Sequence, residues 1–123
     1  MKKVVFIVDD DQLNLIAGVA ALESEYKVFA ILSAKKMFDL IELHKKLPDL
    51  ILLDVEMPDM NGLEAIFELK KREKWKNIPV VFLTAWADDG LQFDAEGLGA
   101  LDLIGKPFDP VALLEVVKKY IGD

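Results

Sequence analysis

The chain has 123 residues, the size of one compact domain, and 53% of them are apolar, so we expect a packed core rather than disorder. It contains no cysteine, which excludes disulfides, thiolate metal sites and cysteine nucleophiles and is typical of a cytoplasmic protein. The net charge of −7 and the dispersed lysines disfavour direct binding of nucleic acid, and no apolar stretch has the length of a membrane span.

Along the chain, short apolar runs alternate with longer amphipathic segments. The runs predict strands over residues 3–8, 26–31, 50–53, 79–83 and 101–104. The amphipathic segments predict helices over residues 12–23, 34–47, 63–73, 85–98 and 110–121. Strict alternation of strand and helix predicts an α/β fold, one domain in which helices cover both faces of a parallel sheet. In such sheets, ligands bind at the carboxyl ends of the strands.

The sequence also predicts where helices begin and which side chains they turn toward the core. Three short polar residues are expected to cap helices at their N-termini: Asp11, Ser33 and Asp109. Helical spacing predicts apolar stripes in the first and third helices, formed by Leu13, Ile16, Ala17 and Ala20, and by Leu63, Ile66 and Phe67.

The fourth predicted helix carries two aromatic residues off its apolar stripe. If Leu91, Ala95 and Leu98 face the core, Trp86 and Phe93 point outward. Beside Leu103 of the fifth strand, two exposed rings would form an apolar patch. Such patches tend to mark surfaces that bind a partner or a second copy of the chain.

The ends of four predicted strands carry charged side chains or a hydroxyl, in chain order Asp9 and Asp10, Asp54, Thr84 and Lys106. Three carboxylates brought close together repel one another, and a hard cation such as Mg²⁺ offsets this repulsion. A lysine ammonium and a threonine hydroxyl both donate hydrogen bonds that suit phosphoryl oxygens. The set therefore predicts Mg²⁺-dependent phosphoryl transfer to an aspartate.

The same residues carry a resemblance to a known family. Val8-Asp9-Asp10-Asp11, residues 53–62, Leu83-Thr84-Ala85 and Gly105-Lys106-Pro107-Phe108 resemble the motifs of response-regulator receiver domains in order and spacing. Each piece alone is weak, but the joint pattern covers nearly the whole chain and is specific. The resemblance implies a flavodoxin-like, doubly wound (βα)5 fold with strand order 2-1-3-4-5.

The resemblance also implies a role for each residue of the site. Asp54 would be the phosphoacceptor, and Asp9 and Asp10 the acidic pair, with Asp10 favoured as the direct Mg²⁺ ligand. Glu56 would give its backbone carbonyl to the metal, and Thr84 would be the switch hydroxyl. Lys106 would pair with a phosphoryl oxygen, and the peptide bond before Pro107 would be cis.

By the same resemblance, the chain is a signalling module rather than a metabolic enzyme. It would take a phosphoryl group from a histidine kinase or a phosphotransfer protein and catalyse its own phosphorylation and dephosphorylation. Its output would pass through the fourth helix, fifth strand and fifth helix to an effector domain, a partner protein or a second copy in a homodimer.

The sequence departs from the family at one position, and two rival functions have to be weighed. Many members have Tyr or Phe at the position of Leu103, and leucine cannot hydrogen-bond, so the coupling of Thr84 to an aromatic switch is in doubt. Leu103 therefore keeps open a pseudo-receiver that binds partners without phosphorylation. A phosphatase or phosphotransferase of the haloacid-dehalogenase kind is disfavoured, because Glu56 stands where a second aspartate is needed.

Overall fold

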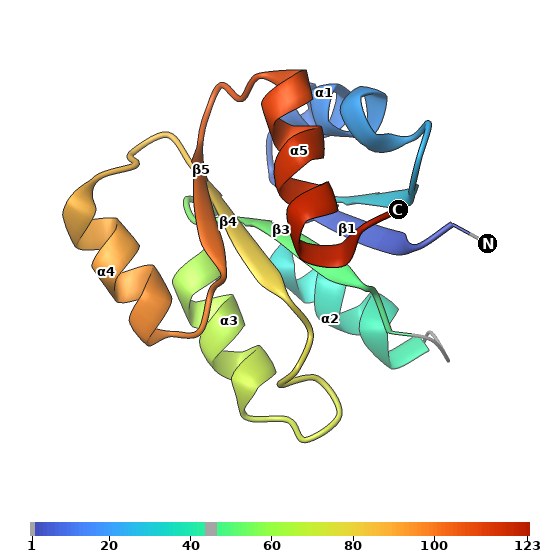
Figure 1. Cartoon of the computed structure of the whole chain (residues 1–123). Coiled ribbons are helices and arrows are strands. Elements are labelled where there is room, and N and C mark those ends of the chain that lie inside the picture. Colours follow the sequence, from blue (N-terminus) through green and yellow to red (C-terminus); the bar gives the residue numbers. More distant parts are fainter. Residues whose placement is uncertain (1, 44–46) are drawn as a thin grey trace.

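A computed structural model describes residues 2–43 and 47–123 of the chain (Figure 1). Strands and helices alternate throughout, as predicted. The strands are β1 Val4–Val8, β2 Lys27–Ile31, β3 Leu50–Asp54, β4 Val80–Thr84 and β5 Asp102–Gly105. The helices are α1 Gln12–Leu22, α2 Ala34–Leu43, α3 Gly62–Lys70, α4 Asp89–Gly97 and α5 Pro110–Ile121.

The strands form one parallel sheet in the order β2-β1-β3-β4-β5. Helices α1 and α5 cover one face and α2, α3 and α4 the other, so the sheet lies between two apolar clusters (Figure 1). The central strands β3 and β4 are buried along their whole length, which explains why their sequences are continuous apolar runs. The predicted α/β fold and strand order are confirmed.

Helix α1 lies on the sheet with a different face from the one predicted. Its buried residues are Leu15, Gly18 and Leu22, and the predicted stripe of Leu13, Ile16, Ala17 and Ala20 is exposed. Helix α1 is apolar on nearly all sides, so the spacing of its apolar residues did not select a face. Gly18 does select one, because a Cβ there would lie 2.2 Å from Ile7 Cδ1.

Helices α3 and α4 also differ from the prediction in detail. The Phe67 side chain of α3 is 52% exposed, whereas Ala65, Ile66 and Leu69 face the core. Helix α4 begins at Asp89, because the Asp88 carboxylate accepts a hydrogen bond from Leu91 N at 2.8 Å and so caps it.

The later start of α4 leaves Trp86 in the loop that follows β4. Both rings are nevertheless exposed as predicted, Trp86 by 72% and Phe93 by 77%. Leu103 of β5 is half-buried and packs against the core cluster beneath α2, α3 and α4.

The predicted N-caps are confirmed at α1, α2 and α5, where Asp11, Ser33 and Asp109 accept hydrogen bonds from backbone N–H groups. The second helix was predicted to run to residue 47. Residues 44–46 lie outside the described residues, and Leu47 lies outside the helix. Among the described residues, no helix combines the length and the apolar composition needed to cross a membrane.

Candidate functional site

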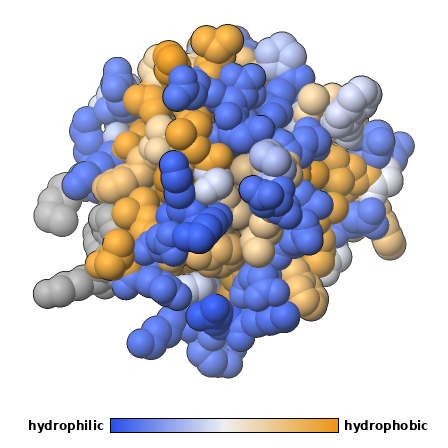
Figure 2. All heavy atoms as spheres, turned by 180° about the vertical axis from the view of Figure 1, so that it is seen from behind, coloured by the Kyte–Doolittle hydropathy of each residue, from blue (hydrophilic) through white to orange (hydrophobic). Residues whose placement is uncertain are grey.

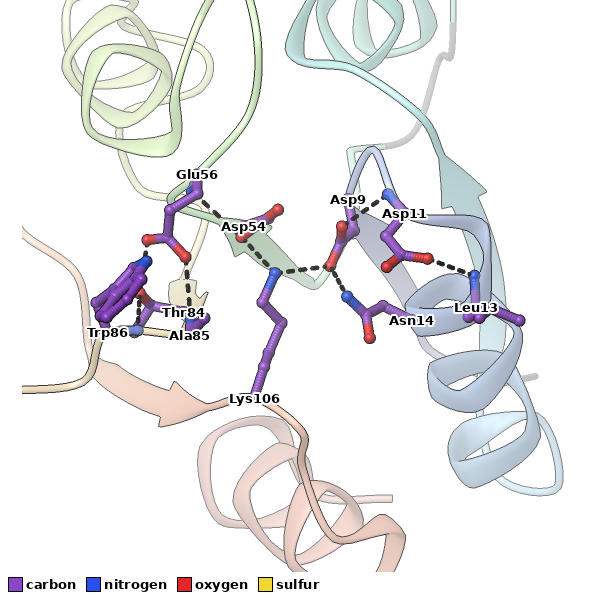
Figure 3. Close-up of polar contacts among 10 residues, drawn as sticks. All are labelled: Asp9, Asp11, Leu13, Asn14, Asp54, Glu56, Thr84, Ala85, Trp86 and Lys106. Carbon is purple, nitrogen blue, oxygen red and sulfur yellow. Dashed lines mark hydrogen bonds and ion pairs between the residues drawn. The ribbon is translucent and has the colours of Figure 1, made fainter.

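The first part of the site is the carboxylate of Asp9, directly after β1. Asp9 is fully buried, and both its oxygens accept hydrogen bonds: Oδ1 from Asp11 N at 2.9 Å and Oδ2 from Asn14 Nδ2 at 3.1 Å (Figure 3). Asp10, the next residue, has an exposed side chain. One member of the acidic pair is therefore fixed inside the protein and the other faces solvent.

Asp54 is the last residue of β3, and its carboxylate is buried at the centre of the site. Lys106 reaches it from the segment after β5, with Nζ 2.8 Å from Asp54 Oδ1 and 3.3 Å from Asp9 Oδ2 (Figure 3). Lys106 is placed by its own N–H, which donates to the Thr84 carbonyl at 2.7 Å. The peptide bond between Lys106 and Pro107 is cis.

Burial of Asp54 changes its acidity. The pKa of its carboxyl group is raised from 3.8 to about 7, mainly because burial removes hydration; Lys106 opposes the rise, and the negative charge of Asp9 adds to it. Burial alone would lower the pKa of Lys106, but the carboxylates of Asp54 and Asp9 raise it above its ordinary value. Lys106 is therefore charged, and it offsets part of the cost of ionising Asp54.

The donor set suits a hard cation. Asp9, Asp10 and Asp54 each offer one carboxylate oxygen, and these oxygens lie within 4.8 Å of one another. Asp54 Oδ2 is buried and has no hydrogen-bond partner among the described residues. A buried oxygen without a partner is costly, and a metal ion beside it would remove that cost. The all-oxygen set fits Mg²⁺, the cation predicted from the sequence.

Thr84, the last residue of β4, is fully buried. Its hydroxyl donates to Glu56 Oε2 at 2.6 Å and accepts from Trp86 N at 3.0 Å (Figure 3). The second oxygen of the same carboxylate, Glu56 Oε1, accepts from Ala85 N at 2.9 Å. The Glu56 side chain thus binds the end of β4 and the loop after it.

The β3–α3 loop is held close to Asp54 by short contacts. Glu56 N donates to Asp54 Oδ1 at 3.2 Å, and Gly62 N donates to the Val55 carbonyl at 3.0 Å. Asn61 and Glu64 form a capping box that starts α3, and Asp59 has a positive φ of 68°. These contacts fix the loop directly after the candidate phosphoacceptor.

The predicted site residues Asp9, Asp54, Thr84 and Lys106 therefore meet at one edge of the sheet, as the topology requires. Two further side chains of the site were not predicted. Asn14 orients Asp9, and a polar residue on the first turn of α1 beside the acidic pair was the available signal. For Glu56 the sequence suggested a role only for the backbone.

Comparison with known proteins decides the family. The sequence model of the response regulator receiver domain matches residues 5–118, nearly the whole chain. This chain belongs to the response regulator receiver domain family. The receiver domain is similar over its full length to the polar-differentiation response regulator DivK of Brucella ovis, with 36% identity over 99% of that protein.

A second relative is longer than this receiver domain. The transcriptional regulatory protein CrdR of Helicobacter pylori is 34% identical, and the chain spans 57% of its length. Among solved structures, the BeF3-activated receiver domain of DrrB from Thermotoga maritima superposes with a TM-score of 0.87, at 27% identity and full coverage of both chains. The family is thus one of two-component signalling, as the motifs predicted.

Proposed function

We propose that this receiver domain accepts a phosphoryl group on Asp54 with Mg²⁺ and passes the change to an output surface. The observation that carries the proposal is the state of the Asp54 carboxylate. One oxygen is held by Lys106, the other is without a partner among the described residues, and the carboxylate as a whole lies close to those of Asp9 and Asp10. That arrangement leaves one oxygen of a buried carboxylate available as the nucleophile.

The transfer needs little from the protein beyond positioning and charge. One oxygen of the Asp54 carboxylate attacks the phosphorus of the donor, a new oxygen–phosphorus bond forms, and the bond to the donor's leaving group breaks. Lys106, now shared between Asp54 and Asp9, is placed to pair with an oxygen of the transferred group. Hydrolysis of the acyl phosphate later returns Asp54 to its free form.

The side chains of Asp10 and Asp54 and the backbone carbonyl of Glu56 would hold Mg²⁺, with Asp9 beside them. When bound, the ion supplies positive charge that neutralises the phosphoryl oxygens. Asp9 is already held by Asn14 and Asp11, which keeps its carboxylate in place as a fixed negative charge.

The partners follow from the chemistry and the surface. The donor is a protein with a phosphohistidine, a histidine kinase or phosphotransfer protein of the cytoplasm. The output surface comprises α4, β5 and α5, with Phe93 on it and Trp86 in the loop before it, both strongly exposed. The Leu103 side chain packs inward from this surface. A conformational change of the output surface would therefore shift a packed leucine side chain rather than an aromatic ring.

The test is the intact mass of the protein after incubation with a small acyl phosphate, with and without Mg²⁺. We expect the native chain to gain one phosphoryl group only with Mg²⁺, and the variant Asp54→Asn to gain none. If the native chain gains none under any condition, the pseudo-receiver that binds partners without phosphorylation replaces this proposal.

A second prediction concerns the exposed apolar face of α1. Leu13 is 75% exposed and Ile16 65% exposed, on the helix that begins directly after the acidic pair. Figure 2 shows apolar side chains at the upper end of the molecule, where Figure 1 places α1 and the start of α5. A protein that brings phosphohistidine to Asp54 must cover surface next to the site, so we expect this face to contact the donor.

We therefore expect Leu13→Glu with Ile16→Glu to slow phosphorylation by a phosphohistidine protein about tenfold or more. The substitutions place charge where apolar side chains would be buried against the donor protein. The rate with a small acyl phosphate should not change. Leu43→Glu is the matched control, an 81% exposed leucine on α2. Equal slowing with both donors would mean that the substitutions damage the site itself.

A further inference from the structure

The Glu56 carboxylate accepts hydrogen bonds from two donors at the end of β4. Thr84 Oγ1 donates to Glu56 Oε2 at 2.6 Å, and Ala85 N donates to Glu56 Oε1 at 2.9 Å (Figure 3). Thr84 is the last residue of β4 and Ala85 follows it, and Asp54 lies two residues before Glu56 at the end of the neighbouring strand. A single anionic side chain thus ties β4 to the loop after the candidate phosphoacceptor.

A hydroxyl group has one proton and can donate it to one acceptor at a time. While Thr84 donates to Glu56, it cannot donate to any other anion at the site. A phosphoryl group on Asp54 would bring several oxygens and further negative charge to this edge of the sheet, and it would require donors of this kind. The Glu56 carboxylate and the phosphoryl group would therefore compete for the same hydroxyl and backbone N–H.

We propose that the Glu56 side chain is a latch that holds Thr84 and Ala85 in the unphosphorylated state and must release them when Asp54 is modified. This inference rests on the proposed function, and it makes Glu56 a positioning residue that acts through Thr84. Release would also free the start of the β4–α4 loop, because Trp86 N donates to the same Thr84 hydroxyl at 3.0 Å. The latch thus connects the site to the exposed Trp86 ring, although position 103 holds leucine in place of an aromatic residue.

Beryllofluoride with Mg²⁺ is the probe, because it binds to a carboxylate as a stand-in for the phosphoryl group. We expect Glu56→Ala to bind it about tenfold more tightly than the native chain, since the competing acceptor is gone. In a Thr84→Ala background, where there is no hydroxyl to release, the same substitution should give a much smaller gain. Glu42→Ala, on the exposed side of α2, is the control and should leave the affinity unchanged.

The double-variant comparison separates the latch from simple removal of negative charge. Loss of charge alone would tighten binding equally with and without the Thr84 hydroxyl, and that result would overturn the latch. Unchanged or weaker binding by Glu56→Ala would overturn it as well. If neither the native chain nor any variant bound beryllofluoride, that result would instead overturn the proposed function, and the role of the latch with it.

A second measurement needs neither the metal nor the anion. In the free protein, the amide resonances of Ala85 and Trp86 should both move in Glu56→Ala, because one loses its acceptor and the other loses a fixed hydroxyl. They should stay in place in Glu42→Ala. Unmoved resonances in Glu56→Ala would show that the latch is not closed in solution and would contradict the proposal.

Discussion

Replacing Asp54 with asparagine is expected to raise the free energy of unfolding at pH 8, in the absence of Mg²⁺, by on the order of 2–4 kcal/mol. Burial raises the pKa of the carboxyl group from 3.8 to about 7, so at pH 8 the folded protein holds a carboxylate that it stabilises poorly. Asparagine keeps an acceptor for Lys106 and Glu56 N but carries no charge. Lys106 keeps the Asp9 carboxylate as its ionic partner.

The sign of the pH dependence follows from proton binding. In the unfolded chain, Asp54 loses its proton near its ordinary pKa of 3.8, and in the folded protein it keeps the proton until about pH 7. Between these two values the folded state binds more protons, so its stability falls as the pH rises. The advantage of Asp54→Asn should therefore be largest at pH 8, shrink as the pH falls through 7, and be nearly absent at pH 4.

Urea unfolding at several pH values, with a chelator present, measures this effect. The control is Asp94→Asn, the same substitution on an exposed side chain of α4 outside the acidic cluster, which should change stability by about 0.5 kcal/mol or less. A destabilised Asp54→Asn at pH 8 would mean that the ion pair with Lys106 outweighs the burial of charge. A gain that did not depend on pH would mean that charge is not its cause.

The fold could be predicted because its signals are long and redundant. The runs before Asp9 and Asp54 are buried on both faces of the sheet, so they are apolar throughout. Once the strands are parallel, their carboxyl ends must lie at one edge, and that places Asp9, Asp54 and Thr84 together without any knowledge of side-chain contacts. The core of the candidate site follows from topology.

The orientation of α1 could not be predicted from spacing. Its apolar residues surround the helix, so several faces satisfied the same pattern. The choice depends on close approach at Gly18 to Ile7 of β1, a contact between residues that are distant in sequence. The unexpected result is an exposed face with Leu13 and Ile16 beside the site, which is the basis for the proposed donor contact.

The hydrogen bonds made by side chains were the least predictable part of the site. The resemblance assigned Glu56 a backbone role, and only the geometry of two adjacent strand ends brings its carboxylate to Thr84. The start of α4 shows the same limit. The apolar pattern predicted a helix from residue 85, but Asp88 caps α4 and leaves Trp86 in the loop, where its N–H donates to the Thr84 hydroxyl.

Substitution of Gly62 by alanine is expected to destabilise the protein by about 1–3 kcal/mol and to weaken the site as well. A Cβ at this position would lie 2.4 Å from the Asp54 carbonyl oxygen and 3.0 Å from Val55 Cα. Both neighbours are backbone atoms, which cannot move aside as the end of a flexible side chain can. The clash must displace either the start of α3 or the end of β3, where Asp54 is held.

Gly97→Ala is the matched control, because among the described residues no atom beyond its chain neighbours and the backbone of its own helix lies within 4 Å of a Cβ built there. On propensity alone, alanine within α4 should stabilise the protein by about 0.5–1 kcal/mol. The two variants should therefore change the urea midpoint in opposite directions, and only Gly62→Ala should also weaken Mg²⁺-dependent binding of beryllofluoride. If Gly62→Ala kept native stability but lost that binding, α3 would absorb the clash and Asp54 alone would move. If it kept both, the loop after β3 would be looser than its hydrogen bonds indicate, and the site would not depend on close contact between Gly62 and Asp54.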